Sequence, residues 1–236
     1  MTEELKKDID NIVWWIPFRK LRCSIRNLLN SLIEDEDKNP IFKPLMTDNE
    51  RKLFLDTVKK SKYYLEFGSG GSTFLVLKTT DAKVFSVEGD NNWIEHMRSN
   101  DYIYEQELIF RLYFYYVNIG KIKIASYPID SSRYNEYPNY SSKVFLELDR
   151  EYINNIDTVF IDGRFRVACV LNSILNINRN ATIIIHDFFN REYYHVLLKY
   201  LDCVNQVDTL GIFKIKNDIN DDDIIELIKE YQYDLR

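Results

Sequence analysis

The middle of the chain alternates short apolar runs with segments of helical periodicity. Uninterrupted apolar runs of this length predict strands buried on both faces, and strands that alternate with helices indicate a parallel sheet. The predicted strands cover residues 63–67, 84–88, 112–119, 157–162 and 181–187. The predicted helices cover residues 72–78, 91–100, 166–177 and 191–201. Two later runs, 204–208 and 211–216, predict an antiparallel hairpin.

This pattern divides the chain into three zones. We expect residues 1–50 to form an N-terminal helical extension, residues 51–216 the α/β domain, and residues 217–236 a C-terminal acidic helix or tail. Aspartates 221–223 open the last helix, where negative charge suits the helix dipole. A length of 236 residues fits one medium domain with short extensions.

Composition narrows the functional classes. The net charge is −6, so we expect no general nucleic-acid binding, which depends on basic contacts to phosphates. The three cysteines, Cys23, Cys169 and Cys203, form no metal-binding pattern and indicate a reducing compartment. The N-terminus does not resemble a signal peptide, and no apolar run reaches the roughly 18 residues of a membrane span. These features predict a cytoplasmic protein.

A glycine-rich turn follows the first predicted strand. Gly68, Ser69, Gly70 and Gly71 stand between that strand and a helix that begins near Ser72. Glycines let a ligand approach the backbone closely, and a helix N-terminus offers free N–H groups. The next strand ends in Glu88, which can accept hydrogen bonds from both hydroxyls of a ribose. The turn therefore predicts a nucleoside site, and a turn without a ligand is the alternative.

The residues around the turn discriminate between nucleoside ligands. The dinucleotide pattern GxGxxG needs glycine where Thr73 stands, and the phosphate-binding P-loop needs a lysine that is absent after Gly71. Glu66 precedes the first glycine by two residues. A carboxylate there would repel a pyrophosphate and could pair with an amino group. S-adenosylmethionine carries an amino acid and no phosphate, so it suits this turn.

The segment from Glu66 to Gly70 and the acid Glu88 resemble motifs I and II of class I S-adenosylmethionine-dependent methyltransferases. The resemblance covers residues 60–216 and includes the terminal hairpin. It implies a Rossmann-like α/β fold, with a mostly parallel seven-stranded sheet, a terminal antiparallel hairpin and helices on both faces. It also implies a cofactor site, with Glu88 at the ribose. The remaining residues expected to contact the cofactor are Glu66, Gly68, Ser69, Gly70, Ser72 and Asp162.

Acids and a histidine fall at the ends of the later strands. The stretch FIDGRFRVACVL at 160–171 resembles the "IDGRFRVA" segment of a bacterial methyltransferase-like subgroup associated with surface-glycan genes, and IIIHDF at 183–188 resembles its fifth-strand signature. In metal-dependent O-methyltransferases, which these segments also resemble, acids ending strands four and five hold Mg²⁺. This resemblance implies that Asp162 and Asp187 are metal ligands. We expect catalysis to involve Asp162, His186 and Asp187, because a hydroxyl acceptor needs a base or a metal.

Several positions depart from the metal-dependent pattern and leave alternatives open. His186 stands where such enzymes carry a second acid, and Arg164 and Arg166 follow Asp162 in place of a histidine. Asp162 could instead cap a helix, and His186 could be a hydrogen-bonded strand-end residue. The two arginines either clamp an acidic substrate or pair with nearby acids.

Two further segments suggest binding surfaces. Residues 126–142 read as a tyrosine-rich loop in which Tyr137 and its neighbours could stack on a sugar ring. Residues 12–33 mix aromatic and basic side chains, which predicts peripheral membrane contact by an interfacial helix. The alternative for that segment is a helix that covers the domain or forms a homodimer.

These observations predict an S-adenosylmethionine-dependent methyltransferase that O-methylates a sugar or glycan precursor. An NAD(P)-binding oxidoreductase is one alternative, against which Thr73 and Glu66 argue. A non-catalytic binding module that keeps the fold is another.

Overall fold

The computed structural model describes residues 43–123 and 126–236, together with residues 11, 13, 14, 21 and 25. The chain separates into two units, Met1–Pro44 and Leu45–Arg236. Most of segment 12–33 lies outside the described residues, so the expected membrane or dimer contact there stays a prediction. No helix in the described part of the chain is long and apolar enough to cross a membrane.

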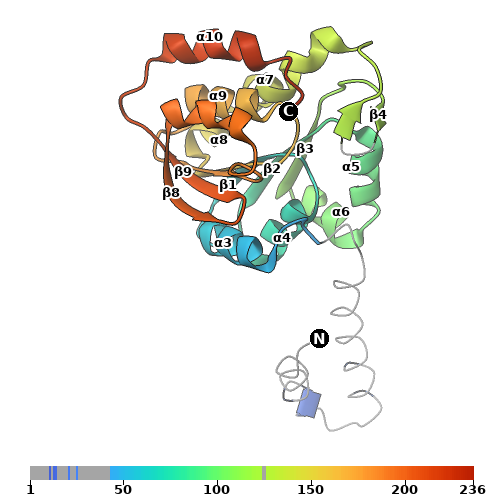
Figure 1. The fold of residues 1–236 in the computed structure, drawn as a ribbon. Helices are drawn as coiled ribbons and strands as arrows, with labels where there is room; N and C mark the ends of the chain where they lie inside the picture. Colours follow the sequence, from blue (N-terminus) through green and yellow to red (C-terminus); the bar gives the residue numbers. More distant parts are fainter. Residues whose placement is uncertain (1–10, 12, 15–20, 22–24, 26–42, 124–125) are drawn as a thin grey trace. The chain divides into compact units, whose positions relative to one another are not determined.

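The second unit is built on a seven-stranded sheet with the order β3-β2-β1-β6-β7-β9-β8 (Figure 1). Five neighbouring strands are parallel, β9 runs antiparallel to β7, and β8 and β9 form the terminal hairpin. This arrangement confirms the predicted fold class. The strands are β1 Tyr63–Phe67, β2 Lys83–Glu88, β3 Leu112–Tyr116, β6 Thr158–Ile161, β7 Thr182–Ile185, β8 Leu201–Val207 and β9 Leu210–Ile215.

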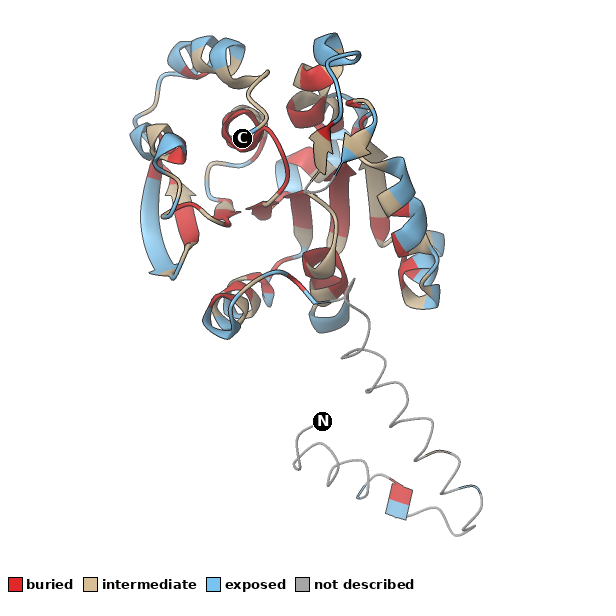
Figure 2. Cartoon of the chain, turned by 45° about the vertical axis from the view of Figure 1, so that its right-hand side comes forward, coloured by how far each residue is buried: buried red, intermediate tan, exposed pale blue. Residues whose placement is uncertain are grey.

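Helices cover both faces of this sheet. Figure 1 shows α3 and α4 on one face and α7, α8 and α9 on the other, with α10 beyond α9. Figure 2 shows that the central strands lie in the buried interior, as the uninterrupted apolar runs predict. The helices are α3 Asp48–Val58, α4 Gly71–Thr79, α5 Asn91–Arg98, α6 Asp101–Leu108, α7 Tyr137–Glu147, α8 Arg150–Asn155, α9 Arg166–Asn176 and α10 Asp221–Tyr231, with 3-10 helices η3 Tyr134–Glu136 and η4 Glu192–Lys199.

The order of strands reverses at β1. The chain moves from β1 outward to β2 and β3, then returns to β6 on the other side of β1. Ligands of open α/β sheets bind at such a reversal, beyond the carboxyl ends of the strands. Phe67, the last residue of β1, pairs in register with Val87 and with Ile161. The loops that follow these three strands therefore leave the sheet at the same level.

Several predicted elements differ in the structure. The helix expected at 91–100 is present as α5, which ends at Arg98, and a second helix that was not predicted, α6, begins at Asp101, where Asn100 caps it and accepts a hydrogen bond from the Ile103 amide at 3.2 Å. Residues 191–201 form the 3-10 helix η4 and then enter β8. The predicted boundary at residues 50 and 51 falls inside α3, and the second unit begins at Leu45.

The tyrosine-rich segment is more ordered than the predicted loop. Strand β5 (Tyr127–Pro128) pairs with β4 (Ile122–Lys123) to form a small antiparallel sheet. Helix α7 begins at Tyr137, within the expected loop, and Pro138 lies in its first turn. Proline favours the first turn of a helix because its missing N–H is not needed there.

The C-terminal segment joins the domain through specific contacts. Ile224 of α10 is fully buried within the hydrophobic core. Tyr233 stacks on Tyr134 of η3, with ring centroids 4.5 Å apart. The backbone carbonyl of Arg236 accepts a hydrogen bond from the Arg166 amide at the start of α9, at 3.0 Å. This segment therefore lies against the loops at the carboxyl end of the sheet.

Candidate cofactor and acceptor site

The glycine turn has the geometry of a ligand cradle. Gly68 adopts a φ of 99°, a conformation that side chains disfavour, and α4 starts at Gly71 with Gly70 as its N-cap. Gly70 has no side chain to cap the helix, so the first-turn amides of α4 receive no acceptor from the N-cap residue. A Cβ atom on Gly70 would meet nothing within 4 Å, whereas one on Gly68 would lie 2.7 Å from the backbone nitrogen of Gly163. The turn is thus packed on one side and open on the other.

Glu66 lies beneath this turn and is fully buried. Its carboxylate accepts hydrogen bonds from the hydroxyls of Tyr64 at 3.2 Å, Ser72 at 3.0 Å and Ser86 at 2.7 Å. Thr73 also donates to Glu66 and accepts from the Gly70 amide at 2.8 Å. Burial raises the pKa of Glu66 to about 7, although the four hydroxyl donors oppose the rise.

These contacts change the expected role of Glu66. The carboxylate holds the start of α4 from below and is not exposed to a ligand's amino group. Thr73, which stands where a dinucleotide-binding turn has its third glycine, is part of this support. The sequence excluded the dinucleotide pattern at this position but did not indicate that its hydroxyl braces the turn.

Glu88 joins the end of β2 to the glycine turn. Its carboxylate accepts hydrogen bonds from the backbone amides of Ser69 at 3.0 Å, Gly89 at 2.7 Å and Asp90 at 3.0 Å. Burial raises the pKa of Glu88 to about 7 despite these three donors. The indole nitrogen of Trp93 donates to the Ser69 carbonyl at 2.9 Å. Glu88 and the glycine turn are therefore adjacent, as their positions at neighbouring strand ends predict.

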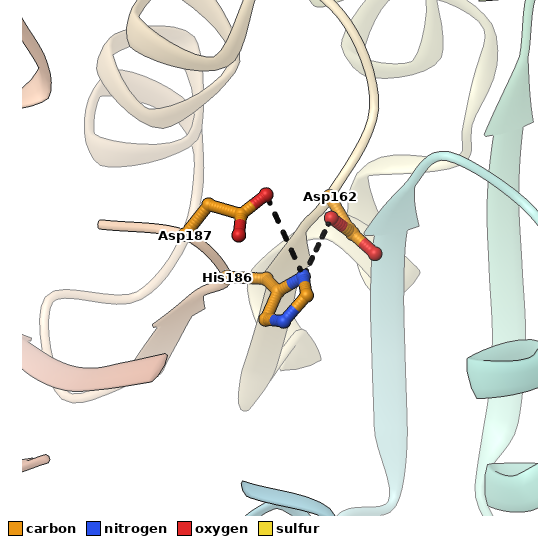
Figure 3. Close-up of side chains that lie close together, drawn as sticks. All are labelled: Asp162, His186 and Asp187. Carbon is orange, nitrogen blue, oxygen red and sulfur yellow. Dashed lines mark hydrogen bonds and ion pairs between the residues drawn. The ribbon is translucent and has the colours of Figure 1, made fainter. Parts of the chain in front are cut away.

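A cluster of acids and one histidine occupies the ends of β6 and β7. Figure 3 shows His186 between Asp162 and Asp187. The His186 Nδ1 atom lies 3.0 Å from Asp162 Oδ1 and 3.9 Å from Asp187 Oδ2. On the other side of the ring, His186 Nε2 lies 3.5 Å from Glu50 Oε2. Both ring nitrogens therefore face carboxylates.

This environment favours the protonated form of His186. Burial alone would lower its pKa, but the hydrogen bond with Asp162 and the charges of Asp162, Asp187 and Glu50 raise it. The pKa of Asp162 is lowered by His186 and Arg166, although burial opposes that change. Burial likewise opposes the shift of Glu50, whose pKa falls to about 2 because Thr209, Thr47 and His186 stabilise its charge.

Arg166 pairs with the acids of the cluster. It is buried and donates to Asp162 Oδ1 at 3.0 Å and to the carbonyls of Gly163 and His186 at 3.0 and 2.5 Å. It also lies 3.5 Å from Asp187 Oδ2. The pairing alternative therefore holds for Arg166, whose guanidinium is used within the protein.

The donor set does not fit Mg²⁺. Ligand atoms of Asp162, His186 and Asp187 lie within 4.8 Å of one another, which is close enough for one ion. Mg²⁺, however, prefers carboxylates and water oxygens in octahedral geometry. Here Arg166 and Arg191 neutralise the two carboxylates, with Arg191 Nη2 at 2.7 Å from Asp187, and an imidazole that favours protonation stands between them. The expected metal role is therefore not supported by the residues present.

The expected stacking role of Tyr137 also meets an obstacle. Tyr137 is buried, and its ring lies 5.3 Å from that of Phe165. Its hydroxyl donates to the Asp130 carbonyl at 3.3 Å. Tyr137 therefore packs the insertion onto the domain and does not present an open face. Tyr134 of the same segment is exposed but stacks on Tyr233.

Sequence reasoning missed Glu50 and Arg191 as members of the cluster. Glu50 had a local signal, because Thr47 and Glu50 form a capping box at the start of α3. Nothing in that motif indicates the contact with His186. Arg191 follows Asp187 by four residues, but the helix predicted at 191–201 did not indicate that the Arg191 side chain contacts Asp187.

Comparison with known proteins shows which solved structures have a similar fold. No protein-family model matches the sequence, and no curated protein matches it. A solved methyltransferase-like protein from Silicibacter pomeroyi DSS-3 is similar, with 23% identity, a TM-score of 0.68, and coverage of 82% of this chain and 98% of that one. Cofactor-bound Rv0187 from MTB has 15% identity, a TM-score of 0.51, and coverage of 79% and 88%.

A third structure extends the likeness over more of the chain. A candidate caffeoyl-CoA O-methyltransferase from Staphylococcus aureus has 14% identity, a TM-score of 0.53, and coverage of 91% of this chain and 100% of that one. At these identities the comparisons establish the fold alone. The chain has the Rossmann-like α/β fold that solved methyltransferases share.

Proposed function

We propose that this protein is an S-adenosylmethionine-dependent methyltransferase that transfers the methyl group to a hydroxyl of a sugar or glycan precursor. The proposal rests on one observation: the glycine turn is open at Gly70 and is hydrogen-bonded to the carboxylate of Glu88. The turn offers amides at the start of α4 that no N-cap side chain occupies, and Glu88 offers a carboxylate beside it. Together these groups suit a ribose and an amino-acid tail.

The cofactor, when bound, supplies an activated methyl group on a sulfonium. Ser69, Gly70 and Ser72 would contact the amino-acid part, and Glu88 would accept hydrogen bonds from the ribose hydroxyls. Asp162 stands at the neighbouring strand end with a side chain that is 30% exposed. Glu66 contributes indirectly by fixing the turn.

Asp162 is the best placed residue to orient an acceptor hydroxyl. The carboxylate of Asp162 is held by His186 and by Arg166, both at 3.0 Å, and is more exposed than either partner. Methyl transfer needs in-line alignment of donor and acceptor, which is chiefly a matter of positioning. His186 acts as a positioning residue, because both of its nitrogens face carboxylates. Asp187 is held by Arg191 and completes the charge balance.

Radiolabelled methyl transfer tests the proposal. The full chain is incubated with S-adenosylmethionine labelled on the methyl group and a panel of sugars and nucleotide sugars. Transfer that disappears in Asp162→Asn but not in the exposed variant Asp56→Asn supports an O-methyltransferase. Binding of S-adenosylhomocysteine without transfer to any acceptor would favour the non-catalytic alternative. Selective binding of NAD would favour the oxidoreductase.

A further inference from the structure

Arg164 lies on the turn that connects β6 to α9, beside the cofactor turn. It is only 8% exposed, although it carries a permanent charge. The preceding residue, Gly163, packs so tightly against the glycine turn that a Cβ on it would lie 2.9 Å from the Phe67 carbonyl. The backbone position of Arg164 is thus fixed next to the proposed site of methyl transfer.

Arg164 forms no ion pair with another described residue, although its charge and that of Asp162 interact at longer range. No described carboxylate oxygen lies within 4.0 Å of its guanidinium nitrogens. Its Nε atom is buried and has no hydrogen-bond acceptor. Arg166, two residues later at the start of α9, donates to two carboxylates and three carbonyls. A buried N–H of a charged group that lacks an acceptor is costly, so the contrast with Arg166 indicates a partner outside the described chain.

Tyr127 determines which part of Arg164 can meet such a partner. The guanidinium carbon lies 4.4 Å from the centroid of the Tyr127 ring. This cation–π contact uses the side of the guanidinium that faces the ring and leaves the N–H groups turned away from the ring for hydrogen bonds. Tyr127 belongs to β5, in the insertion that follows β3. Arg164 therefore lies between the cofactor turn and the insertion, where an acceptor would approach.

We propose that the acceptor carries an anionic group, a carboxylate or a phosphate, and that Arg164 binds it. The inference rests on the proposed function and adds the chemical class of the substrate. Arginine suits both anions because its planar fork matches two oxygens at once. Arg166 does not take this role, since its donors are satisfied within the protein.

The test measures binding of defined probes to the full chain saturated with S-adenosylhomocysteine. Inorganic phosphate, glucose 1-phosphate, glucuronate and glucose are titrated by calorimetry. Wild-type protein should bind at least one anionic probe and bind glucose more weakly. Arg164→Gln should lose about tenfold or more in affinity for that probe, because a charge-assisted contact is removed. Selective binding of the phosphates or of glucuronate identifies the anion.

Matched variants distinguish anion binding by Arg164 from the effects of a lost net charge and of misfolding. Arg150→Gln removes the same charge from an exposed position on α8 and should bind the anionic probe like wild type. Arg164→Lys keeps the charge without the planar fork and should show an intermediate affinity. If Arg164→Gln does not fold, Arg164→Lys and Tyr127→Ala decide the matter, since both should still weaken anion binding.

The outcomes distinguish failure of this inference from failure of the proposed methyltransferase function. Wild-type protein that binds S-adenosylhomocysteine, with anion affinity unaffected by Arg164 variants, overturns the inference alone. Loss of S-adenosylhomocysteine affinity in Arg164→Gln would also overturn it, by assigning Arg164 to the cofactor's carboxylate. Failure of the wild-type chain to bind S-adenosylhomocysteine would remove both.

Discussion

Substitution of Glu88 by glutamine separates cofactor recognition from folding. The wild-type carboxylate accepts three backbone hydrogen bonds, one at Oε2 from Ser69 and two at Oε1 from Gly89 and Asp90. Glutamine can keep the two bonds at Oε1 but places an NH₂ group against the Ser69 amide. That loss costs about 1–3 kcal/mol of folding stability.

The loss is offset because the buried charge of Glu88 is itself unfavourable. Burial raises its pKa from 4.5 to about 7. Each pKa unit corresponds to about 1.4 kcal/mol, so above pH 7 the ionised form lowers the stability of the fold by about 3 kcal/mol relative to acidic pH. Glutamine has no charge to bury. The free energy of unfolding of Glu88→Gln at about pH 8 should therefore lie within about 2 kcal/mol of the wild-type value.

Cofactor binding should change much more. A hydrogen bond from a ribose hydroxyl to a charged acceptor contributes about 1.5–3 kcal/mol, so the Kd for S-adenosylhomocysteine should rise about tenfold to a hundredfold. Titration calorimetry measures the Kd, and urea denaturation measures stability. The control Glu105→Gln makes the same change on an exposed residue of α6 and should bind like wild type. A Glu88→Gln protein that binds with the wild-type Kd would refute the assigned role.

Three other predictions follow from the packing and charges of the site. The pKa of His186 is higher in the folded protein than its unfolded value near 6.5, so protonated His186 stabilises the fold at low pH. This stabilisation is lost as the pH rises through the folded-state pKa. In urea denaturation, His186→Gln should therefore lower the free energy of unfolding more at about pH 6 than at about pH 9. Gly163→Ala should lower the free energy of unfolding by about 3 kcal/mol or more, because the new Cβ would press on the Phe67 carbonyl and on Tyr140; a wild-type melting temperature would contradict this. Millimolar Mg²⁺ should leave the imidazole NMR signals of His186 unchanged, since Arg166 and Arg191 neutralise the two carboxylates; a saturable shift would restore the metal site.

The fold and the cofactor turn could be predicted because they depend on local patterns and on parallel strand geometry. Apolar runs define the parallel strands, and the carboxyl ends of neighbouring strands lie at one edge of a sheet. The order of residues along the chain is therefore enough to predict that Gly68 and Glu88 are adjacent. The hydrogen bond from the Ser69 amide to the Glu88 carboxylate, at 3.0 Å, confirms that the turn and the strand end are adjacent.

The finer parts of the site depend on tertiary contacts that no local pattern shows. Glu50 reaches the cluster only because α3 packs near the β8–β9 turn, where Thr209, 159 residues later, also binds it. The sequence gives no basis for distinguishing Arg164 from Arg166, yet among the described residues only Arg166 forms ion pairs, with Asp162 and Asp187. Phe165 between them adopts a left-handed φ of 54°, and this local turn sends the two guanidiniums into different surroundings.

The proposed cofactor site is tested most directly by calorimetric titration of the wild-type chain with S-adenosylhomocysteine and, separately, with NAD. We predict saturable binding of S-adenosylhomocysteine and no saturable binding of NAD, because the turn offers a carboxylate and amides without an N-cap side chain, and Thr73 stands in place of the third glycine. Selective binding of NAD, or of any phosphate-bearing nucleotide in place of S-adenosylhomocysteine, would contradict this prediction.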